Sequence, residues 1–411
     1  MAGDLYGGRP VWSRSGRNFV LAVLGGEMGM SRLCAVWGIS RSNGYKWLRR
    51  YQESGRAGLR DRSRAPQSHG RAMPAEVTEL LMELRRRRPH WGPRKLRVLL
   101  GREHPQWVIP AASTIGDLLR RHGLSLPRSR RRRRLAGEGG RGVQAGAPNA
   151  VWCADFKGHF RTRDGARCDP LTISDGYSRY LIDCHLVARL TTGAVRERFL
   201  RAFAEHGMPE AIHTDNGVPF AGSGVAGLSR LTVEWVKAGI TLERSRPGHP
   251  QDHGRHERMH RTLKAETASP PATDRVEQQR QCDRFRAEYN CERPHQALGQ
   301  LTPAALYQPS PRRWPARLED PWYDADHQVR RVRREGAIKW MGQAVFISEA
   351  LSGELLGIRE LPWGDYLVRF ANLELGLIRP GESRLRRLRA HTRLHPDAAL
   401  LLPQLSSIYP V

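Results

Sequence analysis

The chain has 411 residues, a formal net charge of +27 and a sequence pI near 11.0, and this length allows several domains with cores of their own. A hydrophobic content of 39% and eleven Trp residues exclude a wholly disordered chain. The sequence contains no apolar run long enough for a membrane span and begins with no recognisable secretory leader, so we expect a cytoplasmic, nucleoid-associated bacterial protein with no membrane partner.

The positive charge is concentrated in the N-terminal third. Residues 1–150 carry a net charge of +20, whereas residues 151–300 carry +3 and residues 301–411 carry +4. A genomic codon bias would explain the preference for Arg over Lys, but it would not explain this asymmetry. Because clustered basic side chains neutralise phosphates and release counterions, we expect the N-terminal third to bind nucleic acid.

Residues 1–60 are predicted to form a helix-turn-helix DNA-binding domain. Apolar side chains from Val20 to Leu24 indicate a first helix, Ser31 is a candidate cap for a second, and Ser40 is a candidate cap for a third after a turn at Gly38. The start of the last helix of such a unit faces the major groove. The candidate DNA contacts there are Arg41, Ser42, Asn43 and Lys46. The alternative is a three-helix bundle that merely carries charge.

A second helical unit and a basic linker follow. Helices near 74–88, 93–101 and 112–122 predict a helix-turn-helix-like domain over residues 61–125. Residues 126–148 form a linker with a dense basic run, for which we expect DNA phosphate contacts. The run consists of Arg130, Arg131, Arg132, Arg133 and Arg134. A nuclear-localisation signal has the same composition, but nothing else in the sequence indicates a eukaryotic protein.

Residues 149–310 have the pattern of an α/β domain. Short apolar runs predict strands at 152–156, 171–173, 180–187, 211–214 and 240–243, with helices at 192–206, 228–238 and 250–267. Three consecutive strands followed by alternating helices and strands indicate a mixed five-stranded sheet with helices on its faces. Further along, short strands over residues 325–382 predict a small β-barrel, and residues 383–411 form a C-terminal tail.

Three acidic residues stand out in the α/β domain. Asp155 lies near the end of the first strand, Asp215 directly follows the fourth, and Glu257 lies in the last helix. If the first and fourth strands are neighbours, these carboxylates come together and repel one another unless cations neutralise them. Carboxylate oxygens favour Mg²⁺ or Mn²⁺, and two such ions activate a water or a 3′ hydroxyl and stabilise the leaving oxygen of a phosphodiester.

Four stretches surround or follow these acids: Trp152-x-x-Asp155, Thr214-Asp215-Asn216-Gly217-x-x-Phe220, Pro250-Gln251-x-x-Gly254-x-x-Glu257-Arg258-x-x-x-Thr262-Leu263-Lys264 and Arg293-Pro294-His295-Gln296-Ala297-Leu298. These motifs resemble those of the integrase-core, DDE-type transposases of bacterial insertion sequences, which share the ribonuclease H-like fold with retroviral integrases. The resemblance implies that Asp155, Asp215 and Glu257 are the catalytic, metal-binding triad. It also implies that Lys264, with Arg261 beside it, contacts DNA near the reacting phosphate.

As a whole, the resemblance implies a transposase that acts on double-stranded DNA. Such an enzyme binds the terminal inverted repeats of its element, cuts at the ends and joins them to target DNA, and it assembles as a dimer or larger oligomer. Two departures concern the long interval between Asp215 and Glu257, which we assign to the Gly-rich loop 221–227, and His253, where many relatives have Asn. A catalytically silent DNA-binding regulator and a nuclease without joining activity remain as alternatives.

A competing motif overlaps the same helix. His256-Glu257-Arg258-Met259-His260 is an HExxH sequence, the pattern of zinc metalloproteases. A protease would need a third ligand that the sequence does not identify, and it would leave Asp155, Asp215 and the basic N-terminal third without a role. We therefore prefer the transposase. The other core acids, Asp175 and Asp183, are interpreted as turn and surface charges, and His213 as a strand residue.

Overall fold

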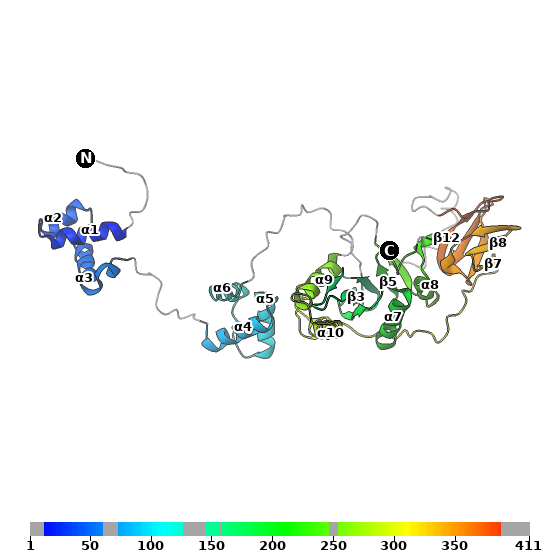
Figure 1. Ribbon diagram of the computed structural model, residues 1–411, viewed down its shortest axis with the longest axis horizontal. Coiled ribbons are helices and arrows are strands. Elements are labelled where there is room, and N and C mark those ends of the chain that lie inside the picture. The colour runs from blue at the N-terminus through cyan, green and yellow to red at the C-terminus, as the bar shows by residue number, and fades with distance from the viewer. Residues whose placement is uncertain are drawn as a thin grey trace. The chain divides into compact units, whose positions relative to one another are not determined.

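The computed structural model describes residues 12–60, 73–125, 145–156, 158–222, 224–245 and 254–387 (Figure 1). The chain divides into two compact units, Met1–Pro74 and Ala75–Val411. The basic run Arg130–Arg134 and His253 lie outside the described residues. Among the helices that are described, none has the length and apolar character that a membrane span requires.

The first unit is a cluster of three short helices: α1 (Trp12–Leu24), α2 (Met30–Val36) and α3 (Arg41–Gly58). The Oγ of Ser40 accepts a hydrogen bond from the backbone N–H of Asn43, which confirms Ser40 as the cap of α3. The prediction that Ser31 caps α2 is wrong, because the extended residue before that helix is Gly29. Gly44 allows α3 to approach α2, since a Cβ there would lie 2.7 Å from the Sγ of Cys34.

The second unit begins with three more helices: α4 (Ala75–Arg87), α5 (Pro93–Glu103) and α6 (Ala112–Arg121). Leu81, Leu96 and Ile115, one from each helix, are fully buried. Arg85 is buried as well, and its guanidinium donates hydrogen bonds to the backbone carbonyls of Leu124 and Trp91 at 2.9 and 2.7 Å. The first Arg of the run 85–88 is therefore a structural residue that is not available to a phosphate.

The α/β domain is built on a mixed sheet. Its strands are β1 (Val151–Phe156), β2 (Phe160–Arg161), β3 (Arg167–Asp175), β4 (Leu181–Val187), β5 (Ala211–Thr214) and β6 (Thr241–Arg244). β3 pairs antiparallel with β4 and β1, and β1, β5 and β6 are parallel to one another. The five predicted strands are present, and the sixth, β2, is a two-residue addition beside β3.

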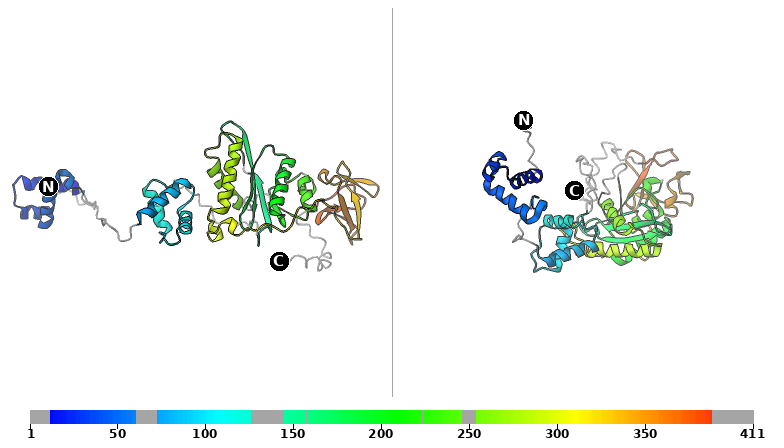
Figure 2. Two further views of the ribbon diagram at one scale, coloured as in Figure 1. Left: turned by 90° about the horizontal axis from the view of Figure 1, so that it is seen from below. Right: turned by 60° about the vertical axis from the view of Figure 1, so that its left-hand side comes forward.

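Two layers of helices cover this sheet (Figure 2). The helices are α7 (Thr192–His206), α8 (Arg230–Lys237), α9 (Gly254–Thr267) and α10 (Arg275–Cys291). α7 and α8 pack in one core with Trp152 and Ala154, whereas α9 and α10 pack in another with Leu181 and Cys184. Because side chains alternate along a strand, Asp155 faces the α9 layer, opposite to Ala154.

The C-terminal part consists of two antiparallel sheets around one apolar core. Its strands are β7 (His327–Arg331), β8 (Ala337–Trp340), β9 (Gln343–Phe346), β10 (Leu355–Glu360), β11 (Tyr366–Phe370) and β12 (Leu373–Ile378). Four strands form a sheet in the order β12-β11-β10-β7, and β8 pairs with β9 separately. The predicted barrel is thus two sheets, because the described strands do not pair into a closed cylinder.

The Gly-rich loop 221–227 of the α/β domain packs against these C-terminal sheets. Val225 and Leu228 belong to the same buried cluster as Val345 and Ile347. A Cβ on Gly224 would lie 2.6 Å from the Oγ of Ser348, so the two segments are in close contact. The loop therefore packs against protein along this part of its length.

Two acids that we interpreted as turn and surface charges are buried instead. Asp175 is 1% exposed and accepts hydrogen bonds from the backbone N–H groups of Asn149 and Ser178 and from the hydroxyl of Ser178. Asp183 is 4% exposed and forms a two-pronged ion pair with Arg198 of α7. The interpretation of Asp175 as a turn residue is confirmed by its bonds to Ser178, but neither acid is a surface charge, because Asn149 and Arg198 bury them from distant parts of the sequence.

Replacing Asp175 with Ala should destabilise the α/β domain by about 2–4 kcal/mol, since two buried N–H groups and a buried hydroxyl lose their acceptor. Urea denaturation would measure the loss. The matched control is Glu205→Ala, which removes an acid that is 54% exposed and 3.7 Å from Arg201, and it should change stability by less than about 0.5 kcal/mol. Equal effects of the two changes would contradict a structural role for Asp175.

Candidate active site

The parallel pairing of β1 with β5 brings two of the predicted acids together. Ala154 pairs with Thr214 across these strands, so the residues that follow them, Asp155 and Asp215, lie at the same end of two neighbouring strands. Neighbouring strands are about 4.8 Å apart. Asp155 is half-buried, with a side chain that is 22% exposed. The expectation that the first and fourth predicted strands are neighbours is confirmed.

Glu257 lies in the first turn of α9, with an exposed side chain. The residue before it, His256, and His260 one turn later are each 5% exposed and contact β3. These contacts hold the start of α9 over the edge of the sheet that carries Asp155. Glu257 directly follows His256 on this helix.

The hydroxyl of Thr172 links β1, β3 and α9. Its Oγ1 donates a hydrogen bond to the backbone carbonyl of Asp155 at 3.1 Å, and the Nε2 atoms of His256 and His260 each lie 2.7 Å from it. A hydroxyl that donates once can accept from both imidazoles. Each imidazole donates to this hydroxyl or accepts from it according to its tautomer, and the Nδ1 of His260 lies 3.8 Å from the Oδ2 of Asp155.

This geometry bears on the HExxH motif. Asp155, His256 and His260 each offer one ligand atom within 4.8 Å of the others, and neither Asp215 nor Glu257 belongs to that group. In a zinc protease the two imidazoles of the motif bind one ion. Here both Nε2 atoms meet Thr172, so the two histidines fasten α9 to the sheet.

A short turn fixes the position of Asp215. Its Oδ1 accepts a hydrogen bond from the backbone N–H of Gly217 at 3.1 Å, and the side chain of Asn216 donates to the carbonyl of Ser245. A Cβ on residue 217 would lie 3.0 Å from the carboxylate of Asp215, which explains the glycine. His213 is a buried strand residue whose Nε2 lies 3.1 Å from the Oγ of Ser245.

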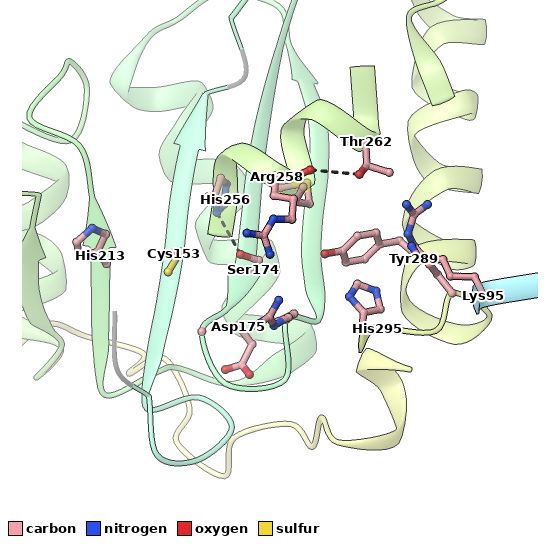
Figure 3. Close-up of a pocket in the computed structure, with 14 residues that line it drawn as sticks. Lys95, Cys153, Ser174, Asp175, His213, His256, Arg258, Thr262, Tyr289 and His295 are labelled. Atoms are coloured by element: carbon pink, nitrogen blue, oxygen red, sulfur yellow. Dashed lines mark hydrogen bonds between the residues drawn. The ribbon is translucent and has the colours of Figure 1, made fainter. Parts of the chain in front are cut away.

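Beside the acids lies a basic cavity of about 150 Å³ that the sequence did not predict (Figure 3). Its lining includes four cationic side chains, Lys95, Arg179, Arg258 and Arg293. Burial, together with Arg293, lowers the pKa of Lys95 to about 8. Burial and the neighbouring cations lower the pKa of His295 to about 3, so this imidazole is neutral at physiological pH. The motif containing Arg293 and His295 was visible in the sequence, but it gave no indication of a cavity.

The predicted DNA contacts occupy exposed positions where they are described. Arg261 and Lys264 are exposed on α9, and Lys264 follows Glu257 by two helical turns. The four residues predicted to enter the major groove are all exposed in the first two turns of α3. They are Arg41, Ser42, Asn43 and Lys46.

Family models match four stretches of the chain. Two models described as "Integrase core domain" match residues 145–250 and 238–303. A "Helix-turn-helix domain" matches residues 17–67 and a "Homeodomain-like domain" matches residues 43–119. The helical and α/β parts of the fold therefore each agree with a known family.

Two curated relatives are proteins of bacterial insertion elements. The chain is 28% identical over 241 residues to the insertion element IS407 uncharacterized 31.7 kDa protein of Burkholderia multivorans, covering 58% of this chain and 82% of that protein. It is 29% identical over 236 residues to the insertion element IS476 uncharacterized 39.2 kDa protein of Xanthomonas euvesicatoria, covering 57% of this chain and less than two thirds of that protein, 64%.

Among solved structures, the HTLV-2 integrase catalytic core domain in complex with magnesium is 16% identical, with a TM-score of 0.32, and the match covers 40% of this chain and 100% of that one. Residues 145–303 thus match integrase-core family models, and the chain is similar to proteins of bacterial insertion elements.

Proposed function

We propose that this protein is a DNA transposase that binds the terminal inverted repeats of its element, cleaves phosphodiester bonds at the ends and transfers the freed strands to target DNA. The observation that supports the proposal is the parallel register of β1 and β5, which puts Asp155 and Asp215 at adjacent strand ends. Two carboxylates at adjacent strand ends and a third on the covering helix suit a site for phosphoryl transfer.

The donor set fits a hard divalent cation. Asp155, Asp215 and Glu257 offer carboxylate oxygens at a half-buried to exposed sheet edge, and such ligands suit Mg²⁺ or Mn²⁺. When bound, two such ions would increase the acidity of the attacking hydroxyl and neutralise charge on the leaving oxygen. The roles of the chain itself are to hold these ligands apart in fixed positions and to align the DNA strand across them.

Two bond exchanges follow from this arrangement. In the first, a water oxygen bonds to the phosphorus at the element end, the bond to the 3′ oxygen breaks, and that oxygen takes a proton to become a 3′ hydroxyl. In the second, this 3′ oxygen loses its proton and bonds to a phosphorus of the target, and a target 3′ oxygen leaves. Arg261 and Lys264 on α9 would hold the phosphates of the strand that undergoes both steps.

The triad is tested by the isosteric changes Asp155→Asn, Asp215→Asn and Glu257→Gln. Each should lower cleavage and joining of labelled element ends in Mg²⁺ by at least about 10³-fold, equivalent to about 4 kcal/mol in the barrier. Binding of the ends should persist, because the helical domains are untouched. Asp169→Asn, on the same sheet but ion-paired to Arg167 on the surface, is the matched control. Wild-type strand transfer by any triad variant would refute the assignment, and nicking without joining by the wild type would favour a nuclease.

The DNA-binding role of α3 is tested with Arg41→Ala and Lys46→Ala. Each should weaken binding to element ends and reduce the slope of log K against log salt concentration by about 1, because one phosphate contact is lost. Fluorescence anisotropy at several salt concentrations would measure both effects. Arg17→Ala, an exposed change on α1 that preserves the fold, is the control. An unchanged salt slope for both variants would show that α3 does not contact DNA.

A further inference from the structure

The basic cavity opens on the same face of the sheet as the candidate triad. Cys153 and Ser174, which are register partners, line it, and Asp155 and Thr172 are the next pair on that face. At about 3.3 Å per strand residue, the cavity floor lies about 7 Å from Asp155 along β1. This distance is about the separation of neighbouring phosphates along one DNA strand, because the rise of about 3.4 Å per nucleotide is measured along the helix axis and not along the backbone.

The charges of the lining favour an anion. Among the described residues of the lining, four cationic side chains meet one carboxylate, Asp175, whose oxygens already accept three hydrogen bonds from the backbone and from Ser178. Arg293 is paired with Glu266 outside this lining. Arg258 extends into the space between Ser174 and Tyr289 (Figure 3).

One of the cations that line this cavity is held by an unfavourable backbone conformation. Arg179 has a φ of 65°, in the left-handed region that a residue with a side chain seldom adopts. The turn that imposes this conformation is held by buried Asp175, and the N–H of Arg179 donates to the carbonyl of the same residue. Strained backbone of this kind clusters at functional sites.

We propose that this cavity binds one backbone phosphate of the DNA end, the one next to the scissile phosphate, with Arg258 and Arg179 as its principal ligands. The inference rests on the proposed function, because it assumes that a DNA strand crosses Asp155. Arg258 directly follows Glu257 on α9, so one helix would supply both a triad residue and a phosphate ligand. Burial is the main cause of the lowered pKa of Lys95, and the nearby Arg293 lowers it further, so a bound phosphate would favour the charged form of this amine.

The test uses element-end duplexes in which one phosphate at a time is a neutral methylphosphonate. With the full-length wild-type protein, a substitution at one position near the cleavage site should weaken binding about tenfold, the value of one charge-assisted contact. With Arg258→Gln or Arg179→Gln the unmodified duplex should bind about tenfold more weakly, and that position should lose its sensitivity. Arg258→Lys, compared with Arg258→Gln, should restore part of that sensitivity. Arg201→Gln, an exposed change on α7, should leave the wild-type profile intact.

Binding is the readout, so the result is independent of cleavage. If the wild type cleaves and the triad variants do not, but the Arg258 and Arg179 variants keep the wild-type methylphosphonate profile, the phosphate site is refuted and the transposase stands. Calorimetric titration with inorganic phosphate is the second arm. Binding of free phosphate that depends on Arg258, without any sensitive position in the duplex, would assign the cavity to a small anion and overturn the proposal.

Discussion

The position of β1 between an antiparallel and a parallel neighbour is the constraint on which the candidate site depends. Pairing with β5 places Asp155 beside Asp215, and pairing with β3 places it opposite Thr172. A shift of one residue in either register would turn Asp155 toward the apolar core under α7. The fully buried Trp152, which packs in that core, makes such a shift costly.

Thr172 links the register of β1 and β3 to the position of helix α9. Its hydroxyl is hydrogen-bonded to the backbone of Asp155 and to both histidines of α9, so one side chain ties the first strand to the helix that carries Glu257. Apolar contacts of Met259 and Leu263 with the sheet hold the rest of α9. Directional hydrogen bonds in the first turns and apolar packing farther along are therefore combined in one helix.

Much of this organisation could be predicted from local pattern. Apolar periodicity located α7, and the neighbouring strand ends indicated that Asp155 and Asp215 would meet. The misplaced residues are those whose environment is made by distant segments. Asp175 precedes a glycine and has the sequence of an exposed turn, yet its partner Asn149 is 26 residues away. The basic cavity draws its lining from α5, β1, β3, α9 and the segment after α10, and no local pattern connects these. Whether the C-terminal strands close into a barrel likewise depends on which strands pair, and the alternation of apolar and polar residues does not specify that pairing.

The packing of loop 221–227 against the C-terminal sheets has a consequence for how the chain can be divided. Val225, Leu228, Val233 and Val236 lie in the α/β part of the sequence, but their apolar surfaces are covered by strands that begin after residue 326. A chain shortened to residue 310 would expose these side chains to water as one apolar patch beside β5, the strand that precedes Asp215. The α/β domain and the C-terminal sheets thus share a buried core, and a fragment that keeps these side chains covered would have to include both.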